Sequence, residues 1–400
     1  MWQKAVKPYV DAGEMVAIGV VQEQHPDRTR LYRQWRELDW PIFVDSMNTL
    51  EHIMVVPVPV AINQTGIVAH NRFEPDQLEG FVRTELEMPV IPADYNRILK
   101  TVPGERPSDD ASDVDWHAWG RDVFNLGDAD QIDLAVTALD KSAKLNPANG
   151  TIQFSLGTAL RRRYEGPHRK PLDNQRAVEH WGLALDANPN HYIYRRRLQQ
   201  YGPRLDKPYN FYFWVQQARA DIRSREEVPF TLAAEPMGSE IAQPESKAST
   251  SIVAALVNPD PHGQINRDEK GLVQIEPLVT PARVRPGHRI RARITFRLAG
   301  DSLPWWNNEA DGIQTWIDVS EGIEIAENKF AMSNPEEPET QELRQVEIEL
   351  IVGKSQPEGA ITIPGYALYY VCEDAGGVCY YLRQDFSLNV TVDADAPTLK

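Results

Sequence analysis

The two cysteines are the residues of this sequence best suited to chemistry. Cys372 and Cys379 are the only cysteines among 400 residues, and they bracket the segment EDAGGV. If Ala375 and Gly376 form a two-residue hairpin turn, the cysteines lie directly opposite each other on neighbouring strands. Opposed Cα atoms are roughly 4.5–5.5 Å apart, which is within disulfide reach. The spacing therefore predicts a cross-strand disulfide, or two thiols close enough to form one.

Three interpretations of this pair remain open. It is a structural or resting disulfide that ties the hairpin, a redox pair that passes electrons to a thioredoxin-type partner, or two inert buried thiols. Glu373 and Asp374 follow Cys372 directly, and neighbouring carboxylates raise the pKa of a thiol, which disfavours a standing thiolate nucleophile. We therefore expect the pair to receive electrons rather than to attack first. We also expect Cys372 or Cys379 to be partly open to solvent.

A second candidate is the aromatic and polar run formed by Trp305, Trp306, Asn307, Asn308 and Glu309. Such a run could line a binding cleft, but adjacent tryptophans in a β-rich segment more often pack into the core and its rim. We favour packing.

Metal, nucleotide and hydrolase sites leave no recognisable pattern. The nine histidines are scattered, and none has metal-ligand spacing to another histidine or to a cysteine. There is no glycine-rich phosphate loop and no Gly-x-Ser-x-Gly elbow. We expect no cofactor and no metal.

Length and charge limit the class of protein. A chain of 400 residues predicts two to four domains. The net charge of −16 repels nucleic acid and anionic membranes, so neither is an expected partner. No apolar run reaches the roughly 18–20 residues of a membrane span, and no signal peptide is visible at the amino terminus.

Residues 1–100 read as alternating helices and strands. Helices are predicted over 1–13, 27–40 and 74–86, and strands over 15–21, 41–45, 55–62 and 67–70. This order, with a proline-led hairpin, resembles the thioredoxin superfamily, nearest its TlpA and peroxiredoxin-like branches. In that family a cis-proline opens a strand and a glycine turn follows nine residues later, a spacing matched by Pro57 and Gly66. The resemblance therefore implies a cis bond at Pro57.

The departures from the thioredoxin pattern concern its active site. The family places a central strand and a Cys-x-x-Cys motif before the first helix, whereas this sequence begins inside that helix. If Pro8 is the family's kinking proline, Gln3 stands at the second cysteine position. Without the central strand, residues 16–21 and 58–63 lose their usual neighbour. Either the chain starts upstream of Met1 or the domain is a reduced form, and residues 1–88 hold no thiol nucleophile.

Residues 115–222, after a linker over 101–114, resemble a pair of degenerate tetratricopeptide repeats. Asn-Pro pairs at 146–147 and 188–189 end two helices, and small or apolar residues recur at the positions that the repeat requires. These positions are Trp119, Leu126, Ala135, Leu139, Leu156, Gly157, Leu160, Trp181 and Ala184. Because two repeats are too few for independent stability, we expect the helix over 210–222 to cap the stack.

Residues 251–395, after a linker over 223–250, read as seven to nine short strands that form a β-sandwich. Alternation is clear in RIRARITF and in SLNVTV. The last hundred residues resemble the amino-terminal domain of DsbD-type thiol:disulfide interchange proteins, although here six rather than five residues separate Cys372 from Cys379.

We therefore expect a multidomain α/β, α and β architecture: an incomplete thioredoxin-like domain, helical repeats and a carboxy-terminal sandwich. The leading functional hypothesis is a thiol–disulfide redox or redox-sensing accessory protein, at most an oxidoreductase acting through Cys372 and Cys379, with repeats that dock other proteins. The alternative is a non-catalytic interaction scaffold with a structural disulfide. The resemblance favours a periplasmic location, whereas the absence of a visible signal peptide favours the cytoplasm.

Overall fold

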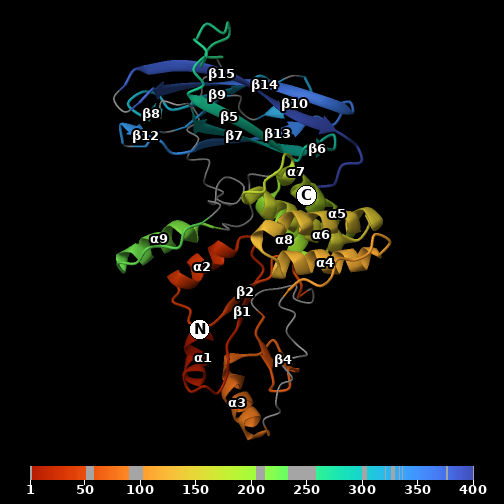
Figure 1. The fold of residues 1–400 in the computed structure, drawn as a ribbon. Helices are drawn as coiled ribbons and strands as arrows, with labels where there is room; N and C mark the ends of the chain where they lie inside the picture. Colours follow the sequence, from red (N-terminus) through yellow and green to blue (C-terminus); the bar gives the residue numbers. More distant parts are fainter. Residues whose placement is uncertain are drawn as a thin grey trace. The chain divides into compact units, whose positions relative to one another are not determined.

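The computed structural model describes residues 2–50, 58–89, 102–203, 212–232, 258–299, 304–319 and 321–399, with short gaps at 326–328, 333, 336 and 375–376. The chain is multidomain and mixes helices with several sheets, as the sequence predicts (Figure 1). It divides into two compact units. Unit 1 comprises Met1–Asp173, Ala187–Arg196 and Trp214–Glu235, and unit 2 comprises Asn174–Asp186, Arg197–Phe213 and Pro236–Lys400.

The first elements of unit 1 follow the predicted order of helices and strands. They are α1 (Trp2–Asp11), β1 (Gly19–Val21), α2 (Pro26–Trp35), β2 (Ile42–Val44), β3 (Val60–Ile62), β4 (Val68–Asn71), the 3-10 helix η1 (Pro75–Gln77) and α3 (Leu78–Glu87). Pro26 suits the first position of α2, where the missing N–H has no helical partner. Gly66 has a φ of 81° in the turn between β3 and β4, a conformation that favours glycine.

The four described strands of this region form two separate two-stranded sheets. β1 pairs with β2 in parallel, and β3 pairs with β4 antiparallel. Apolar side chains of α1, β3 and α3 share a small core made of Val6, Ala61, Phe73, Leu78 and Val82. Pro57, with its predicted cis bond, lies outside the described residues.

Within the described residues, seven helical elements follow. They are α4 (Asp113–Leu126), the 3-10 helix η3 (Ala129–Gln131), α5 (Ile132–Leu145), α6 (Gly150–Glu165), α7 (Asp173–Ala187), α8 (Tyr192–Tyr201) and α9 (Trp214–Ser224). Ser112 precedes α4 and caps it through reciprocal hydrogen bonds with Asp115. The side chain of Asn149 accepts hydrogen bonds from the free backbone N–H groups at the start of α6. α5 packs against both α4 and α6, with Ala135 and Leu139 wholly buried. These two residues stand at predicted repeat positions.

The expectation that the segment 210–222 caps the repeat stack is met only in part: Gln200 of α8 donates to the hydroxyl of Tyr212, whereas α9 itself packs mainly on another helix. Its main contacts are with α2, where Trp214 stacks on Trp35 with the ring centroids 5.9 Å apart. The indole Nε1 of Trp35 also donates to Asp221 of α9 at 2.7 Å. The aromatic stacking and this hydrogen bond hold α9 against α2, and the helical periodicity of 210–222 does not reveal this contact.

Unit 2 is built mainly of strands. They are β5 (Val273–Thr280), β6 (Arg283–Val284), β7 (Arg289–Leu298), β8 (Trp305–Asn307), β9 (Gln314–Ile317), β10 (Ile323–Ile325), β11 (Lys329–Ala331), β12 (Glu339–Thr340), β13 (Arg344–Val352), β14 (Gly359–Cys372) and β15 (Cys379–Val392). One sheet has the order β10-β13-β7-β5. The other has the order β11-β9-β14-β15-β6, with β8 pairing to both β12 and β14.

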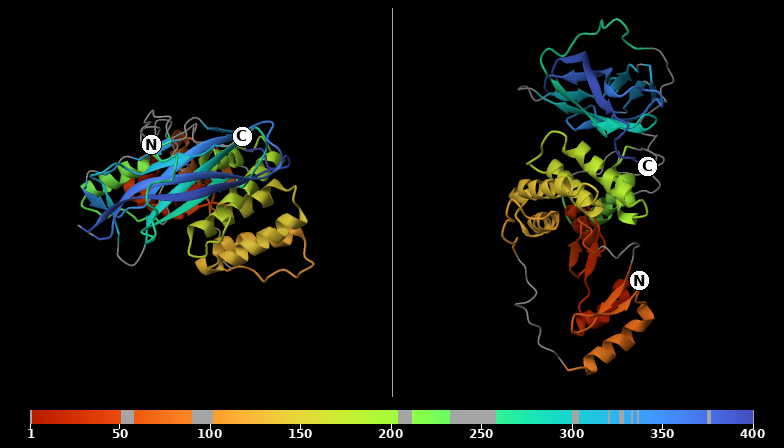
Figure 2. Two further views of the ribbon diagram at one scale, coloured as in Figure 1. Left: turned by 90° about the horizontal axis from the view of Figure 1, so that it is seen from above. Right: turned by 90° about the vertical axis from the view of Figure 1, so that its right-hand side faces the viewer.

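Side chains from the two sheets meet in one hydrophobic core, and the sheets lie face to face (Figures 1 and 2). β13 alternates buried and half-buried residues along its whole length, as a strand with one face on the core does. From the second sheet, Ile363, Tyr369 and Val371 of β14 and Leu388 and Val390 of β15 enter the same core. The long β14–β15 hairpin therefore has a core face and an outer face.

Candidate functional site

The two cysteines form a disulfide at the end of the β14–β15 hairpin. Cys372 is the last residue of β14 and Cys379 the first of β15, and the antiparallel register places them directly opposite each other. Their Cα atoms are 3.9 Å apart and their sulfur atoms are bonded. The predicted cross-strand disulfide is thereby confirmed, and neither cysteine is a free thiol.

The two halves of the disulfide differ in exposure. Cys372 is 0% exposed, because β8 flanks it on one side and β15 on the other. Cys379, the first residue of β15, is exposed. One cysteine is thus open to solvent, as expected, and an incoming reagent meets Cys379 before Cys372.

The face that carries the disulfide is aromatic. Trp305 of β8 lies directly opposite Cys372, and paired residues project to the same face of a sheet. Two residues further along, Tyr370 and Tyr381 are opposed and stack with ring centroids 4.4 Å apart. Burial, together with the nearby Tyr370 and Asp311, raises the pKa of Tyr381 to about 12. Its hydroxyl is therefore neutral at physiological pH.

Glu339 brings a carboxylate to the disulfide. It lies on β12, opposite Asn307 of β8, and β8 connects it to β14. A carboxylate oxygen of Glu339 and the sulfur atoms of Cys372 and Cys379 all lie within 4.8 Å of one another. Sequence reasoning missed this residue. β12 is only two residues long, and no spacing along the chain links it to the cysteines.

A charged pair stands beside the hairpin end. Lys270 forms an ion pair with Glu373, and its Nζ lies 3.0 Å from the hydroxyl oxygen of Tyr380. The hydrogen bond from Lys270 lowers the pKa of Glu373, and the same contact raises the pKa of Lys270. The sequence predicted that Glu373 acts on Cys372. In the structure its carboxylate is already paired with a cation.

The aromatic and polar run around Trp306 packs as the sequence favours. Trp306 is 0% exposed in the core, and its Nε1 donates to the backbone oxygen of Glu342 at 2.9 Å. Asn308 donates to the backbone oxygen of Glu337 at 2.7 Å and to Thr340. From this run, Trp305 lies directly opposite Cys372.

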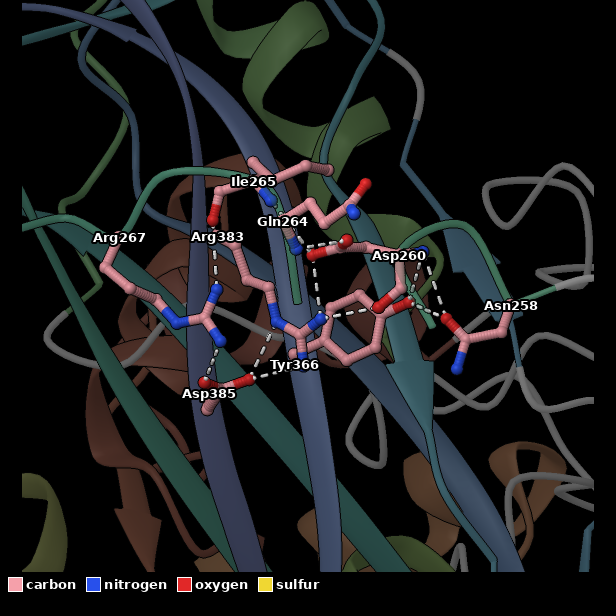
Figure 3. Close-up of polar contacts among 8 residues, drawn as sticks. All are labelled: Asn258, Asp260, Gln264, Ile265, Arg267, Tyr366, Arg383 and Asp385. Carbon is pink, nitrogen blue, oxygen red and sulfur yellow. Dashed lines mark hydrogen bonds and ion pairs between the residues drawn. The ribbon is translucent and has the colours of Figure 1, made fainter. Parts of the chain in front are cut away.

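A second polar cluster attaches the loop before β5 to the hairpin (Figure 3). Asp260 is 5% exposed and accepts hydrogen bonds from Arg383 of β15 at 2.8 Å and from the backbone N–H of Gln264 at 2.8 Å. The guanidinium of Arg383 lies 3.7 Å from the ring centroid of Tyr366, whose hydroxyl bonds to Asn258. Since these polar groups bind one another, the cluster serves to hold the loop.

A third cluster lies in unit 1 and is also internal. His25, just before α2, contacts Glu165 of α6 with Nδ1 2.7 Å from the carboxylate oxygen, and Arg161 pairs with the same carboxylate. Burial disfavours the charged carboxylate, but attraction to His25 and Arg161 outweighs this and lowers the pKa of Glu165 to about 2. With all three side chains at most 10% exposed, the cluster joins α2 to α6 and offers no opening to a substrate.

Among the described residues, no helix is both long and apolar enough to cross a membrane. Comparison with known proteins adds no family. No protein-family model matches the chain, and no curated protein matches it.

The similarities to solved structures are weak. The chain aligns with Spo0M, the sporulation control protein of Bacillus subtilis, at 12% identity and a TM-score of 0.17, over 31% of this chain and 50% of that one. It thus spans about half of Spo0M. AvmM, which catalyzes macrocyclization in alchivemycin A biosynthesis, aligns at 10% identity and a TM-score of 0.18, over 34% of this chain and 97% of AvmM. The alkylpurine DNA glycosylase AlkC of Pseudomonas fluorescens aligns at 13% identity and a TM-score of 0.16, over 79% of this chain and 85% of AlkC. Nothing about this protein follows from such scores.

Proposed function

We propose that this protein is a thiol–disulfide accessory protein that receives electrons at the Cys372–Cys379 disulfide from a thioredoxin-type dithiol. The observation that carries the proposal is the asymmetry of the pair: Cys379 is exposed and Cys372 is wholly buried at the end of a hairpin. An accessible sulfur atom defines the point of attack, and a buried one defines the leaving group.

The exchange proceeds in two steps. A thiolate of the partner attacks Sγ of Cys379, the bond between Cys372 and Cys379 breaks, and Cys372 leaves as a thiolate that takes up a proton. The partner's second thiolate then attacks the mixed disulfide and releases Cys379, which also takes up a proton. The partner is oxidised to a disulfide and this protein gains two electrons and two protons.

The other parts of the chain are assigned supporting roles. The element order of α1 to α3 resembles that of a thioredoxin-like domain without its cysteines, and the paired helices α4 and α5 resemble a tetratricopeptide unit. Both suit protein docking rather than thiol chemistry. The two sheets of unit 2, with their shared core, resemble the β-sandwich of DsbD-type proteins, and that likeness supports a periplasmic location.

The test traps the mixed disulfide. The oxidised protein is mixed with a thioredoxin variant whose second active-site cysteine is replaced by serine, so that the second step cannot occur. We expect a mixed disulfide that peptide mass spectrometry assigns to Cys379 and not to Cys372. The matched control uses oxidised protein and a thioredoxin variant without either cysteine. Failure to form the adduct, or an adduct mainly at Cys372, contradicts the proposed exchange.

A second function is favoured by one specific observation. Because Cys372 is 0% exposed, its thiolate leaves into a poorly solvated site, and burial among apolar groups raises a thiol pKa. This favours an interaction scaffold whose disulfide only ties the hairpin. A midpoint potential below about −300 mV supports the scaffold, whereas a midpoint near that of thioredoxin, about −270 mV, supports exchange.

A further inference from the structure

The disulfide end of the hairpin contains three metal-ligating groups from three strands. They are the sulfur atoms of Cys372 on β14 and Cys379 on β15 and a carboxylate oxygen of Glu339 on β12, all within 4.8 Å of one another. The strand pairings that place them are regular: β12 pairs with β8, β8 with β14, and β14 with β15. The three groups therefore stand on strands of one sheet, with β8 between β12 and β14, rather than on unrelated loops.

We infer that the reduced pair and Glu339 form a binding site for Zn²⁺. Two thiolates and one carboxylate are a ligand set that Zn²⁺ accepts, with Zn–S distances of about 2.3 Å and Zn–O distances of about 2.0–2.2 Å. In a tetrahedral site such bonds put the ligand atoms roughly 3.5–3.8 Å apart. The 4.8 Å envelope encloses that geometry once the sulfur atoms separate. A water molecule completes the fourth position.

The ligand set also selects among metals. Thiolates are poor ligands for Mg²⁺ and Ca²⁺, which prefer oxygen atoms only. Cu⁺ prefers soft sulfur ligands and binds a carboxylate only weakly. Two thiolates with one carboxylate therefore favour Zn²⁺ over these competitors.

Redox state controls the site. In the disulfide neither sulfur is a thiolate, so only Glu339 remains as an anionic ligand. A dithiol or phosphine reductant donates two electrons, the S–S bond breaks, and two protons complete the thiols. Zn²⁺ then displaces those two protons, since a metal binds the deprotonated ligand. The bound metal occupies both sulfur atoms and slows their reoxidation.

This inference rests on the proposed function only in requiring that the disulfide can be reduced. It needs no protein partner, so the two ideas fail separately. If phosphine-reduced protein binds zinc but a thioredoxin dithiol does not reduce the disulfide, the metal site stands and the exchange proposal falls. If thioredoxin reduces the pair and zinc does not bind, the reverse holds.

The experiment titrates the full chain with zinc. Protein reduced with a phosphine, and the oxidised protein beside it, receive Zn²⁺ in competition with a chromogenic chelator. We expect one equivalent bound by reduced protein and none by oxidised protein. Co²⁺ in place of Zn²⁺ is expected to give a thiolate-to-cobalt charge-transfer band only after reduction.

Two substitutions assign the carboxylate. Glu339→Gln is expected to weaken zinc binding at least about tenfold, because it removes one of three protein ligands. Glu337→Gln, an exposed residue two positions earlier, serves as the matched control and leaves the affinity unchanged. Circular dichroism of both variants checks that they fold.

Three outcomes overturn the inference. They are no zinc bound by the reduced protein at a tenfold excess of metal, equal binding by the oxidised and reduced forms, and equal affinity of the Glu339→Gln and Glu337→Gln variants.

Discussion

Arg383 on β15 pairs with Asp260 in the loop before β5, with Nη1 of the guanidinium 2.8 Å from Oδ2 of the carboxylate. Asp260 is 5% exposed, so burial alone would raise its pKa. The hydrogen bonds from Arg383 and from two backbone N–H groups outweigh burial and lower the pKa of Asp260. The loop over the outer face of the hairpin is thus held by a charge pair whose carboxylate is buried and whose guanidinium is half-buried.

Replacing Arg383 by alanine is therefore expected to be costly. The Arg383→Ala variant leaves the buried Asp260 carboxylate without its cation and removes the contact with the ring of Tyr366. We expect a loss of about 3 kcal/mol in the free energy of unfolding, measured by urea denaturation of the full chain. Arg267→Ala is the control, because its ion pair with Asp385 is exposed and worth at most about 1 kcal/mol. Equal losses in the two variants would falsify the role assigned to the buried pair.

The packing of α4 on α5 depends on a glycine. A Cβ atom at Gly120 would lie 2.8 Å from Cγ of Leu139 and 3.1 Å from Cβ of Ala138. We expect Gly120→Ala to lower the free energy of unfolding by about 1–3 kcal/mol, because α5 must move to admit the methyl group. Gly80→Ala in α3 is the control: nothing lies within 4 Å of its Cβ, and alanine favours a helix by up to about 1 kcal/mol. Thermal unfolding of both variants measures the difference. A Gly120→Ala protein as stable as Gly80→Ala contradicts the close approach.

His117 makes the stability of unit 1 sensitive to mild acid. Burial, aided by the positive charge of Arg121, lowers the pKa of His117 to about 4, and its Nε2 lies 2.9 Å from Oγ of Ser155. The unfolded chain has a histidine pKa near 6.5 and binds the proton first. Stability is therefore complete above about pH 6.5 and falls as the pH drops toward 4.

The expected contribution of His117 is about 2–3 kcal/mol between pH 7 and pH 4.5. His117→Gln removes the titrating group, so the variant is expected to lose less stability than the unaltered protein over this interval. Urea denaturation of both proteins at pH 7.0 and pH 4.5 measures how much the free energy of unfolding of each one falls. An equal loss of stability in the two proteins would show that His117 does not take up a proton on unfolding.

The disulfide is expected to add only modest stability. Its two cysteines are seven positions apart, and closing so short a loop removes little entropy from the unfolded chain. Reduction with a phosphine should lower the free energy of unfolding by less than about 3 kcal/mol, while the far-ultraviolet circular dichroism stays the same. Reduction that unfolds unit 2 outright would mean that the bond is required for folding.

Local patterns in the sequence determined much of this protein. The cysteine hairpin follows from two cysteines that bracket a turn-forming segment, and the alternation in RIRARITF predicts a strand that the structure places in β7. Helix ends are equally local, as Ser112 before α4 and Asn149 before α6 demonstrate. These features depend on residues within a few positions of one another, and so a single sequence reveals them.

Long-range pairing is what only the tertiary structure decided. Glu339 reaches the cysteines because the two-residue strand β12 pairs with β8, and no local periodicity marks a strand so short. Trp214 stacks on Trp35 across about 180 residues of chain, and this contact holds α9 against α2. Lys270 likewise forms an ion pair with Glu373. The expectation that Glu373 raises the pKa of Cys372 rested only on their being adjacent in the sequence. In each case the contact joins segments that are far apart in the sequence, and residue spacing along the chain does not indicate which distant segments meet.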